Sequence, residues 1–219
     1  MRRIGMMTSL LVLTLPLSLA GQRSALREVR RGGEGSLGIE FVLAEPLGEF
    51  RRTGSHAAGL AIHGVTRGSP LGVRIDGGWM VYDHNYQGYG VSTMSQIGSI
   101  MIGPQLTLGQ GSTRIYGFVL GGGSLFWSDM NYSDSCGCSD SDFIDGDLTF
   151  SRSAGAGVLL QLSRKVGLDF GVRETRHDRV TYFPAGGLTD NGDGTYSGTQ
   201  VTTAVLQRVW QVGVSIALR

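Results

Sequence analysis

Apolar residues alternate with small or polar residues along most of the chain after residue 36. The clearest case is residues 165–177, where valine, leucine and phenylalanine alternate with glycine, aspartate and arginine. Successive side chains of a β-strand point to opposite faces, so a period of two predicts a strand with two different faces. On this pattern we predict eight strands, at about residues 36–44, 57–66, 71–82, 95–107, 113–126, 149–163, 165–177 and 200–218.

The connections between these strands alternate in length. Three are tight turns, at Arg67–Pro70, Leu108–Ser112 and Arg164, and four are long loops, at residues 45–56, 83–94, 127–148 and 178–199. In an up-and-down meander, every long loop then lies at one end, and every short turn lies with both termini at the other. Short periplasmic turns, long outer loops and an even number of ~10-residue strands are typical of bacterial outer-membrane barrels. The predicted fold class is therefore all-β, an eight-stranded antiparallel up-and-down transmembrane β-barrel.

The two faces of the predicted strands differ in chemistry. One carries valine, leucine, isoleucine and phenylalanine, which suits contact with lipid; in residues 113–126 the alternating apolar residues are Tyr116, Phe118 and Leu120. The other carries glycine, alanine and serine with a few charged and amide side chains. The lumen of an eight-stranded barrel is just wide enough for side chains, and an unpaired buried charge is costly.

We therefore expect a packed polar lumen in which nearly balanced charges pair and hold the barrel together. Its predicted members are Glu40, Arg74, Asp76, Gln105, Asp169, Arg173 and Gln211, with His63 and Gln161 on the same face. A proton or ion path through these residues is the alternative, and a filled lumen disfavours it.

The first twenty residues have the features of a cleaved secretory signal peptide. Arg2 and Arg3 give a positive start, residues 10–19 are mostly apolar, and Ser18-Leu19-Ala20 supplies small residues for cleavage after Ala20. The apolar run is shorter than the ~20 residues that a transmembrane helix needs. We predict a signal peptide at 1–20, a polar periplasmic linker at 21–35 and the outer-membrane barrel at 36–219.

Composition narrows the classes of function. Glycine accounts for 36 of the 219 residues, and glycine inside a helix costs ~1 kcal/mol relative to alanine, so long helices are disfavoured. The net charge is +1, which provides no basic field to hold nucleic acid.

The end of the chain carries a further pattern. In the last predicted strand, Gln211, Gly213, Ile216 and Leu218 follow the order polar, any, glycine, two of any, apolar, any, apolar. This resembles the C-terminal membrane insertion signal of the small eight-stranded outer-membrane barrels of the OmpA/OmpX and opacity-protein type. That family usually has aromatic residues at the last apolar positions, where this chain has isoleucine and leucine.

The resemblance covers about residues 36–219. It implies an integral outer-membrane protein that is a monomer. Its implied partners are outer-membrane lipid, lipopolysaccharide and the barrel-insertion machinery.

The third long loop holds two cysteines, Cys136 and Cys138, and six aspartates. A zinc site needs about four ligands, and a redox pair has two residues between its cysteines. A local disulfide around Gly137 and free or intermolecular thiols both remain open. The aspartates are interpreted as a solvated acidic loop, with Ca²⁺ binding as the alternative. No metal and no cofactor are predicted.

Two other classes of protein compete with a non-enzymatic barrel. A lipid-acting outer-membrane enzyme would use a histidine near the rim, for which His56, His84 and His177 are candidates, but no G-x-S-x-G motif occurs. A soluble exported barrel of the lipocalin kind would bury the apolar face around a ligand. We predict no catalytic residue and a structural or surface-interaction protein of the outer membrane, with its specificity in four long surface loops.

Overall fold

The computed structural model describes residues 35–66, 70–88, 91–109, 111–133, 139–192 and 195–218. The predicted signal peptide, almost all of the predicted linker, and both Cys136 and Cys138 lie outside these ranges. No helix in the described ranges has the length and apolar character that crossing a bilayer requires.

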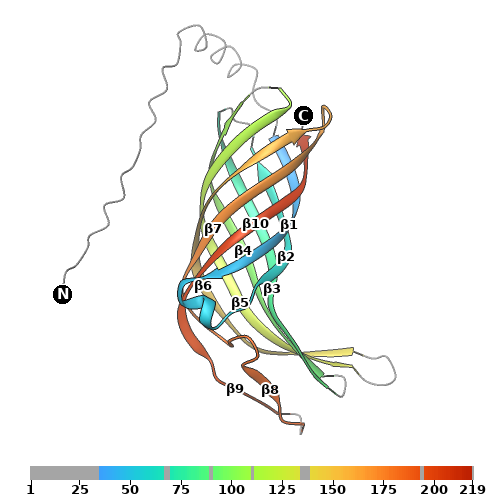
Figure 1. The fold of residues 1–219 in the computed structure, drawn as a ribbon, viewed down its shortest axis with the longest axis vertical. Coiled ribbons are helices and arrows are strands. Elements are labelled where there is room, and N and C mark those ends of the chain that lie inside the picture. Colours follow the sequence, from blue (N-terminus) through green and yellow to red (C-terminus); the bar gives the residue numbers. More distant parts are fainter. Residues whose placement is uncertain are drawn as a thin grey trace, which may run out of the picture.

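Eight long strands close into one antiparallel barrel (Figure 1). Each strand pairs with its neighbour along the chain, and the first strand pairs with the last to close the ring, in the order β1-β10-β7-β6-β5-β4-β3-β2. The predicted up-and-down eight-stranded fold is confirmed. The strands are β1 Gly35–Leu47, β2 Ala57–Val65, β3 Leu71–Gly88, β4 Val91–Leu108, β5 Thr113–Ser133, β6 Ser139–Gln161, β7 Val166–Tyr182 and β10 Val201–Leu218.

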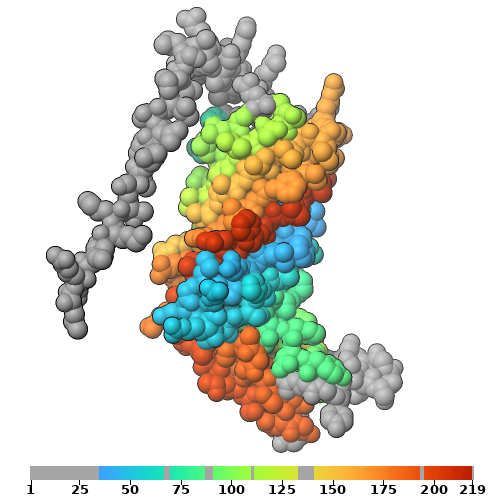
Figure 2. All heavy atoms as spheres, in the orientation of Figure 1, coloured from blue at the N-terminus to red at the C-terminus, as the bar shows by residue number. Residues whose placement is uncertain are grey.

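The two ends of the barrel differ as the loop lengths predict. The end of β10 lies at one end of the barrel, at the top of Figure 1, together with the strand ends that border the short connections β2–β3, β4–β5 and β6–β7. The β4–β5 turn contains Gly109 and Gly111, whose φ angles of 109° and 79° are in the region that favours glycine. Figure 2 shows β1 in blue and β10 in red side by side, where the barrel closes.

The prediction of long loops at residues 83–94 and 127–148 is wrong, because the described residues of both segments are mainly strand. β3 continues to Gly88 and β4 begins at Val91, while β5 continues to Ser133 and β6 begins at Ser139. The register shifts between Val81 and Asp83 and between Ser128 and Asp129. A bulge adds one residue to a strand and breaks the period of two on which the prediction depended.

The other two long connections contain short elements that the pattern did not predict. The 3-10 helix η1, Gly48–Arg52, follows β1. The connection from β7 to β10 contains a small two-stranded sheet formed by β8, Leu188–Asp190, and β9, Tyr196–Gly198. Figure 1 shows η1 and this sheet at the end opposite the C-terminus.

The barrel interior has an apolar part and a polar part. Thirteen buried apolar residues from the loop-end halves of the strands and from η1 form one cluster, which includes Phe50, Tyr82, Phe126 and Tyr182. The buried charged residues lie between this cluster and the short-turn end. The core of the protein is thus the lumen of the barrel, filled by side chains.

Candidate functional site

The buried charges meet at Asp76 on β3. Its Oδ1 accepts a hydrogen bond from Arg74 Nε at 2.6 Å, and its Oδ2 accepts one from Arg173 Nη1 of β7 at 2.7 Å. Arg74 also contacts Glu40 of β1, with 3.5 Å between Nη2 and Oε1, and donates from Nη1 to Gln105 at 3.3 Å. All five side chains are buried, so the pairing takes place away from water.

A second group of contacts extends this network around His63 of β2. His63 Nδ1 lies 3.0 Å from Glu40 Oε1, and Nε2 lies 3.8 Å from Asp169 Oδ2 on β7. Tyr116 donates to Asp169 at 2.5 Å, and the Gln211 amide donates to Glu40. The seven predicted members of the luminal network and His63 therefore lie in the interior, and the contacts join β1, β2, β3, β4, β5, β7 and β10. Gln161 is only partly buried and accepts a hydrogen bond from Arg114 at 3.2 Å.

Two aromatic side chains complete the network, and sequence reasoning placed them on the wrong face. Tyr116 and Phe118 belong to the predicted lipid-facing set of strand five, but both point inward with Leu120, and Ile115 and Val119 point outward. The Arg74 guanidinium lies 4.5 Å from the centre of the Phe118 ring, a cation–π contact. Because both faces of this strand are apolar, the alternation did not distinguish them.

Glu40, His63 and Asp169 bring potential metal ligands within 4.8 Å of one another. Arg74 lies against the same Glu40 oxygen that faces His63. A divalent cation would compete with this guanidinium for the carboxylate. We interpret the group as an ion-pair network, in which three carboxylates face two arginines and one histidine.

The loop end of the lumen is closed by aromatic rings. Phe50 of η1 is fully buried, and its ring centre lies 6.0 Å from that of Tyr82 and 5.6 Å from that of Tyr182, in edge-to-face geometry. Tyr82 donates to the Phe183 backbone at 3.1 Å, and the Tyr182 hydroxyl lies 2.6 Å from that of Thr53. The connection after β1 thus folds inward over the lumen.

The candidate rim histidines have different environments. His56 and His84 are exposed. His177 is buried beyond the charged network, with Nδ1 2.7 Å from the Ser151 hydroxyl and its ring edge-on to Phe126. A Ser–His contact has the spacing of a nucleophile and its base, but the two residues are 0% and 1% exposed. Both side chains thus pack as part of the interior wall.

Three aspartates of the predicted acidic loop are bonded within the protein. Asp129 accepts from Trp127 at 3.0 Å and from Gln96 at 2.5 Å, Asp147 accepts from the Thr181 backbone at 2.7 Å, and Asp145 accepts from Gln200. These bonds connect the β5–β6 extension, the parts of β5 and β6 within residues 127–148, to neighbouring segments. Each of these bonds uses one oxygen, Oδ2, of its carboxylate.

The outer wall of the barrel is apolar over most of its height. On β10 the outward residues are apolar from Trp210 to Leu218, and the next outward residue is Arg208, which pairs with Glu174 of β7 at 2.6 Å. The outward residues are large and half exposed, and they include Leu37, Ile39, Phe41, Leu60, Ile62, Ile75, Ile100, Ile102, Val119, Phe170, Val212 and Ile216. We call this surface the apolar band.

On the opposite side, two tryptophans lie toward the loop end of the apolar band. Trp79 donates its indole N–H to Gln96 at 2.6 Å, and Trp127 donates to Asp129. Indoles with an apolar body and a bonded N–H are typical of membrane–water interfaces.

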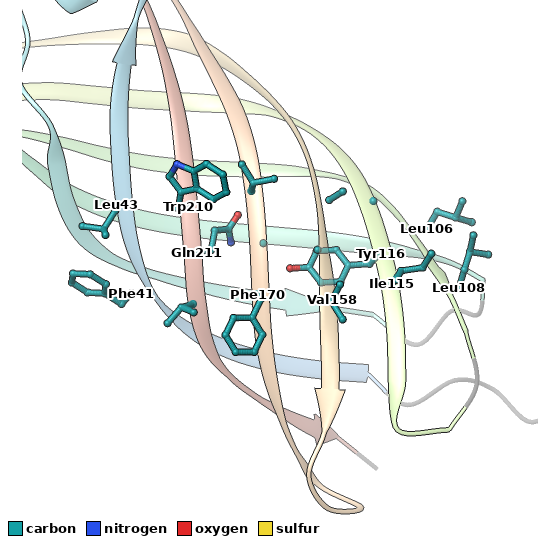
Figure 3. Close-up of a pocket in the computed structure, with 16 residues that line it drawn as sticks. Phe41, Leu43, Leu106, Leu108, Ile115, Tyr116, Val158, Phe170, Trp210 and Gln211 are labelled. Atoms are coloured by element: carbon teal, nitrogen blue, oxygen red, sulfur yellow. The ribbon is translucent and has the colours of Figure 1, made fainter. Parts of the chain in front are cut away.

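A cavity of about 850 Å³ opens in the apolar band. Its floor contains the small residues Gly117, Ala156, Gly157 and Gly171, and larger side chains on neighbouring strands stand beside it. Figure 3 shows Trp210, Phe170, Val158 and Ile115 among those that line it. We call this cavity the wall groove.

Comparison with known proteins supports the fold. No family model and no curated protein matches the chain. Among solved structures, the chain is similar to Neisserial surface protein A, with 15% identity and a TM-score of 0.50 over 83% of this chain and 96% of that one. It also matches Ail of Yersinia pestis, with 13% identity and a TM-score of 0.46 over 85% of this chain and 99% of that one.

A third similar structure is a major outer membrane protein of Thermus thermophilus, with 14% identity and a TM-score of 0.46 over 84% of this chain and 99% of that one. The similarity to Neisserial surface protein A is evidence of the fold and not of the role. The resemblance to small eight-stranded barrels is thus confirmed as a resemblance of fold.

The residues of the predicted insertion signal divide between the two faces. Gln211 is buried against Glu40, whereas Ile216 and Leu218 are about half exposed in the apolar band. Gly213 pairs with Glu40 across the β1–β10 closure.

Proposed function

We propose that this chain is a monomeric integral protein of the bacterial outer membrane, non-enzymatic, with a structural or surface-interaction role. The observation that carries the proposal is the inverted arrangement of its side chains. Charged residues such as Glu40, Arg74 and Asp169 are at most 3% exposed, while Ile62 and Ile100 on the outer wall are 58% and 72% exposed. Contact of such an apolar outer surface with hydrocarbon is favourable, whereas its contact with water is unfavourable.

The soluble, lipocalin-like alternative has the opposite requirement. It would need the apolar band inside, around an apolar ligand, with the charges in water. Monomeric soluble proteins rarely expose contiguous apolar patches above a few hundred Å², and here the patch extends around the barrel. The closed ring also pairs every strand edge, as backbone groups in lipid require.

The orientation follows from the lengths of the connections. The short turns, the start of β1 and the end of β10 would face the periplasm, and the β3–β4 and β5–β6 extensions, η1 and the β8–β9 sheet would face outward. Ile216 and Leu218 would then serve the barrel-insertion machinery from the periplasmic end. Lipid and lipopolysaccharide would contact the apolar band, and surface partners would contact the loop end.

The test is cell fractionation combined with gel migration. We expect recovery in the outer membrane and faster migration when the sample is not boiled, because a closed barrel stays folded in detergent. A mature N-terminus at Gly21 would agree with the predicted signal peptide. Recovery in the soluble fraction, or a helical circular dichroism spectrum, would overturn the proposal.

A further inference from the structure

Two arginines face each other on the outer wall of the barrel. Arg152 of β6 lies directly opposite Arg176 of β7, and both are exposed. Like charges placed opposite each other on neighbouring strands are destabilising. In the described part of the chain, neither arginine has an acidic partner within 4.0 Å, and the nearby Glu174 is paired with Arg208. Asp178, two residues beyond Arg176, is exposed and outside ion-pair distance.

On β7 and β10 the pair lies where the outward residues change from apolar to charged, at Glu174 and Arg208, whereas on β6 the apolar surface continues past Arg152 to Phe150 and Leu148. Along β6, from the short-turn end toward the loop end, the outward residues that precede Arg152 are Ala156 and Ala154. Along β7, the outward residues that precede Arg176 are Val172 and Glu174. Arginine side chains are long enough to lie along apolar surface while the guanidinium group reaches the level of the lipid headgroups. An anion between the two guanidinium groups would remove their mutual repulsion.

The wall groove begins close to this pair. Ala156 and Val172 both line the groove, and each lies four residues from its arginine, which is about 13 Å along a strand. An acyl chain attached to a headgroup at the arginines would span that distance. The small side chains along β6 leave space for it, and Trp210 stands beside the groove (Figure 3).

We propose that Arg152 and Arg176 bind the anionic phosphate of an outer-leaflet lipid, and that one acyl chain of this lipid lies in the wall groove. This proposal rests on the proposed membrane location and adds a specific site of lipid binding to it. It assigns a bound lipid to one side of the barrel, over β6 and β7, in place of uniform lipid contact. The neutral Arg208–Glu174 pair beside it leaves the positive charge with these two arginines.

The experiment uses Trp210 as a reporter. In a chain with Trp79→Phe and Trp127→Phe, Trp210 is the remaining tryptophan. The protein, folded in zwitterionic micelles, is titrated with phosphatidylglycerol or phosphatidylcholine carrying brominated acyl chains, which quench indole fluorescence on contact. We expect quenching at lower mole fractions of phosphatidylglycerol. Arg152→Gln with Arg176→Gln should weaken this preference by about fivefold for each arginine.

Two further variants separate binding from folding. Arg176→Glu places a carboxylate opposite Arg152, so the barrel should be at least as stable while the preference disappears. Arg164→Gln, in the turn at the opposite end of the barrel, is the control and should keep the preference for the anionic lipid. Equal quenching by both lipids in the folded parent protein, or an unchanged preference in the double variant, would overturn the inference.

Inorganic phosphate distinguishes the source of the anion. Millimolar phosphate should leave quenching by the anionic lipid almost unchanged, because the acyl chain adds to its binding. Complete displacement would mean that the site takes a free anion, which would overturn the assignment to lipid. A protein that shows no heat-modifiable migration in these micelles would instead contradict the proposed function.

Discussion

Asp76 is the residue through which opposite sides of the barrel interact. It is on β3, and Arg173, which binds one of its oxygens, is 97 residues away on β7 across the lumen. The other oxygen holds Arg74. Loss of this carboxylate would remove the acidic partner of Arg173 among the described residues and would leave Arg74 with Glu40.

Arg173→Ala tests the cost of breaking this pairing. Removing one member of a buried pair typically costs ~3–5 kcal/mol. In this variant Asp76 keeps Arg74, but three buried carboxylates are left with one arginine and one histidine. We expect a large fall in the urea midpoint in lipid vesicles. Arg179→Ala, on the same strand with an exposed side chain, should change the midpoint little. Equal midpoints for the two variants would mean that Arg173 is not a structural charge of the lumen.

Replacing Asp76 and Arg173 together by apolar residues is the companion measurement. This double variant removes one charge of each sign and leaves Arg74 with Glu40. Part of the stability lost in Arg173→Ala should return. If the double variant is less stable than both single variants, the energy of the pair exceeds the cost of burying it.

The Ser151–His177 pair gives a prediction about reactivity. A serine activated by a neighbouring base reacts with fluorophosphonate probes, but burial of both side chains keeps such a probe away. The folded protein in detergent should therefore remain unlabelled under conditions that label a serine hydrolase added to the same sample. Labelling of the parent protein that disappears in Ser151→Ala would contradict the non-enzymatic interpretation of the pair.

At the scale of elements, the β1–β10 closure depends on close approach at Gly213. A Cβ at this position would lie 2.2 Å from the Ile39 carbonyl oxygen and 2.8 Å from the Cα of Glu40. Close packing between β1 and β10 therefore favours glycine at this position, independently of any recognition by the insertion machinery.

Gly213→Ala should destabilise the barrel by about 1–3 kcal/mol, the usual cost of forcing an extra carbon into a packed site. Gly64→Ala on β2 is the control, because a Cβ there would meet nothing within 4 Å. Both variants can be compared by urea unfolding and by the fraction that migrates as folded barrel. A normal Gly213→Ala protein would show that the β1–β10 ribbon can separate at this point.

At the scale of the whole molecule, the filled lumen predicts that the barrel does not conduct. The ion-pair network occupies the middle and Phe50 closes the loop end. Purified protein in planar bilayers should show no steady, ohmic conductance, whereas an open porin measured in the same bilayers should conduct. Long-lived channels from the monomer would contradict the packed interior and would revive the ion-path alternative.

The sequence by itself determined that there are eight strands, the two faces of most of them and the direction of the meander. Alternation identifies a face within one strand, because side chains of a strand point to either side in turn. It was sufficient for Glu40, Asp76 and Asp169, and it failed at Tyr116 and Phe118, where the two faces have similar polarity. The length of each connection placed the loops at one end, but bulges after Val81 and Ser128 hid the strand extensions beyond them.

Only the tertiary structure decided which side chains meet. The partners of Arg74 and Arg173, the position of Phe50 over the lumen and the opposition of Arg152 and Arg176 all depend on the stagger between strands. Stagger is set by closure of the ring, where β1 must pair with β10 while all other pairs are kept. A period of two along one strand contains no information about that constraint, because sliding a strand by two residues preserves its faces and changes every partner.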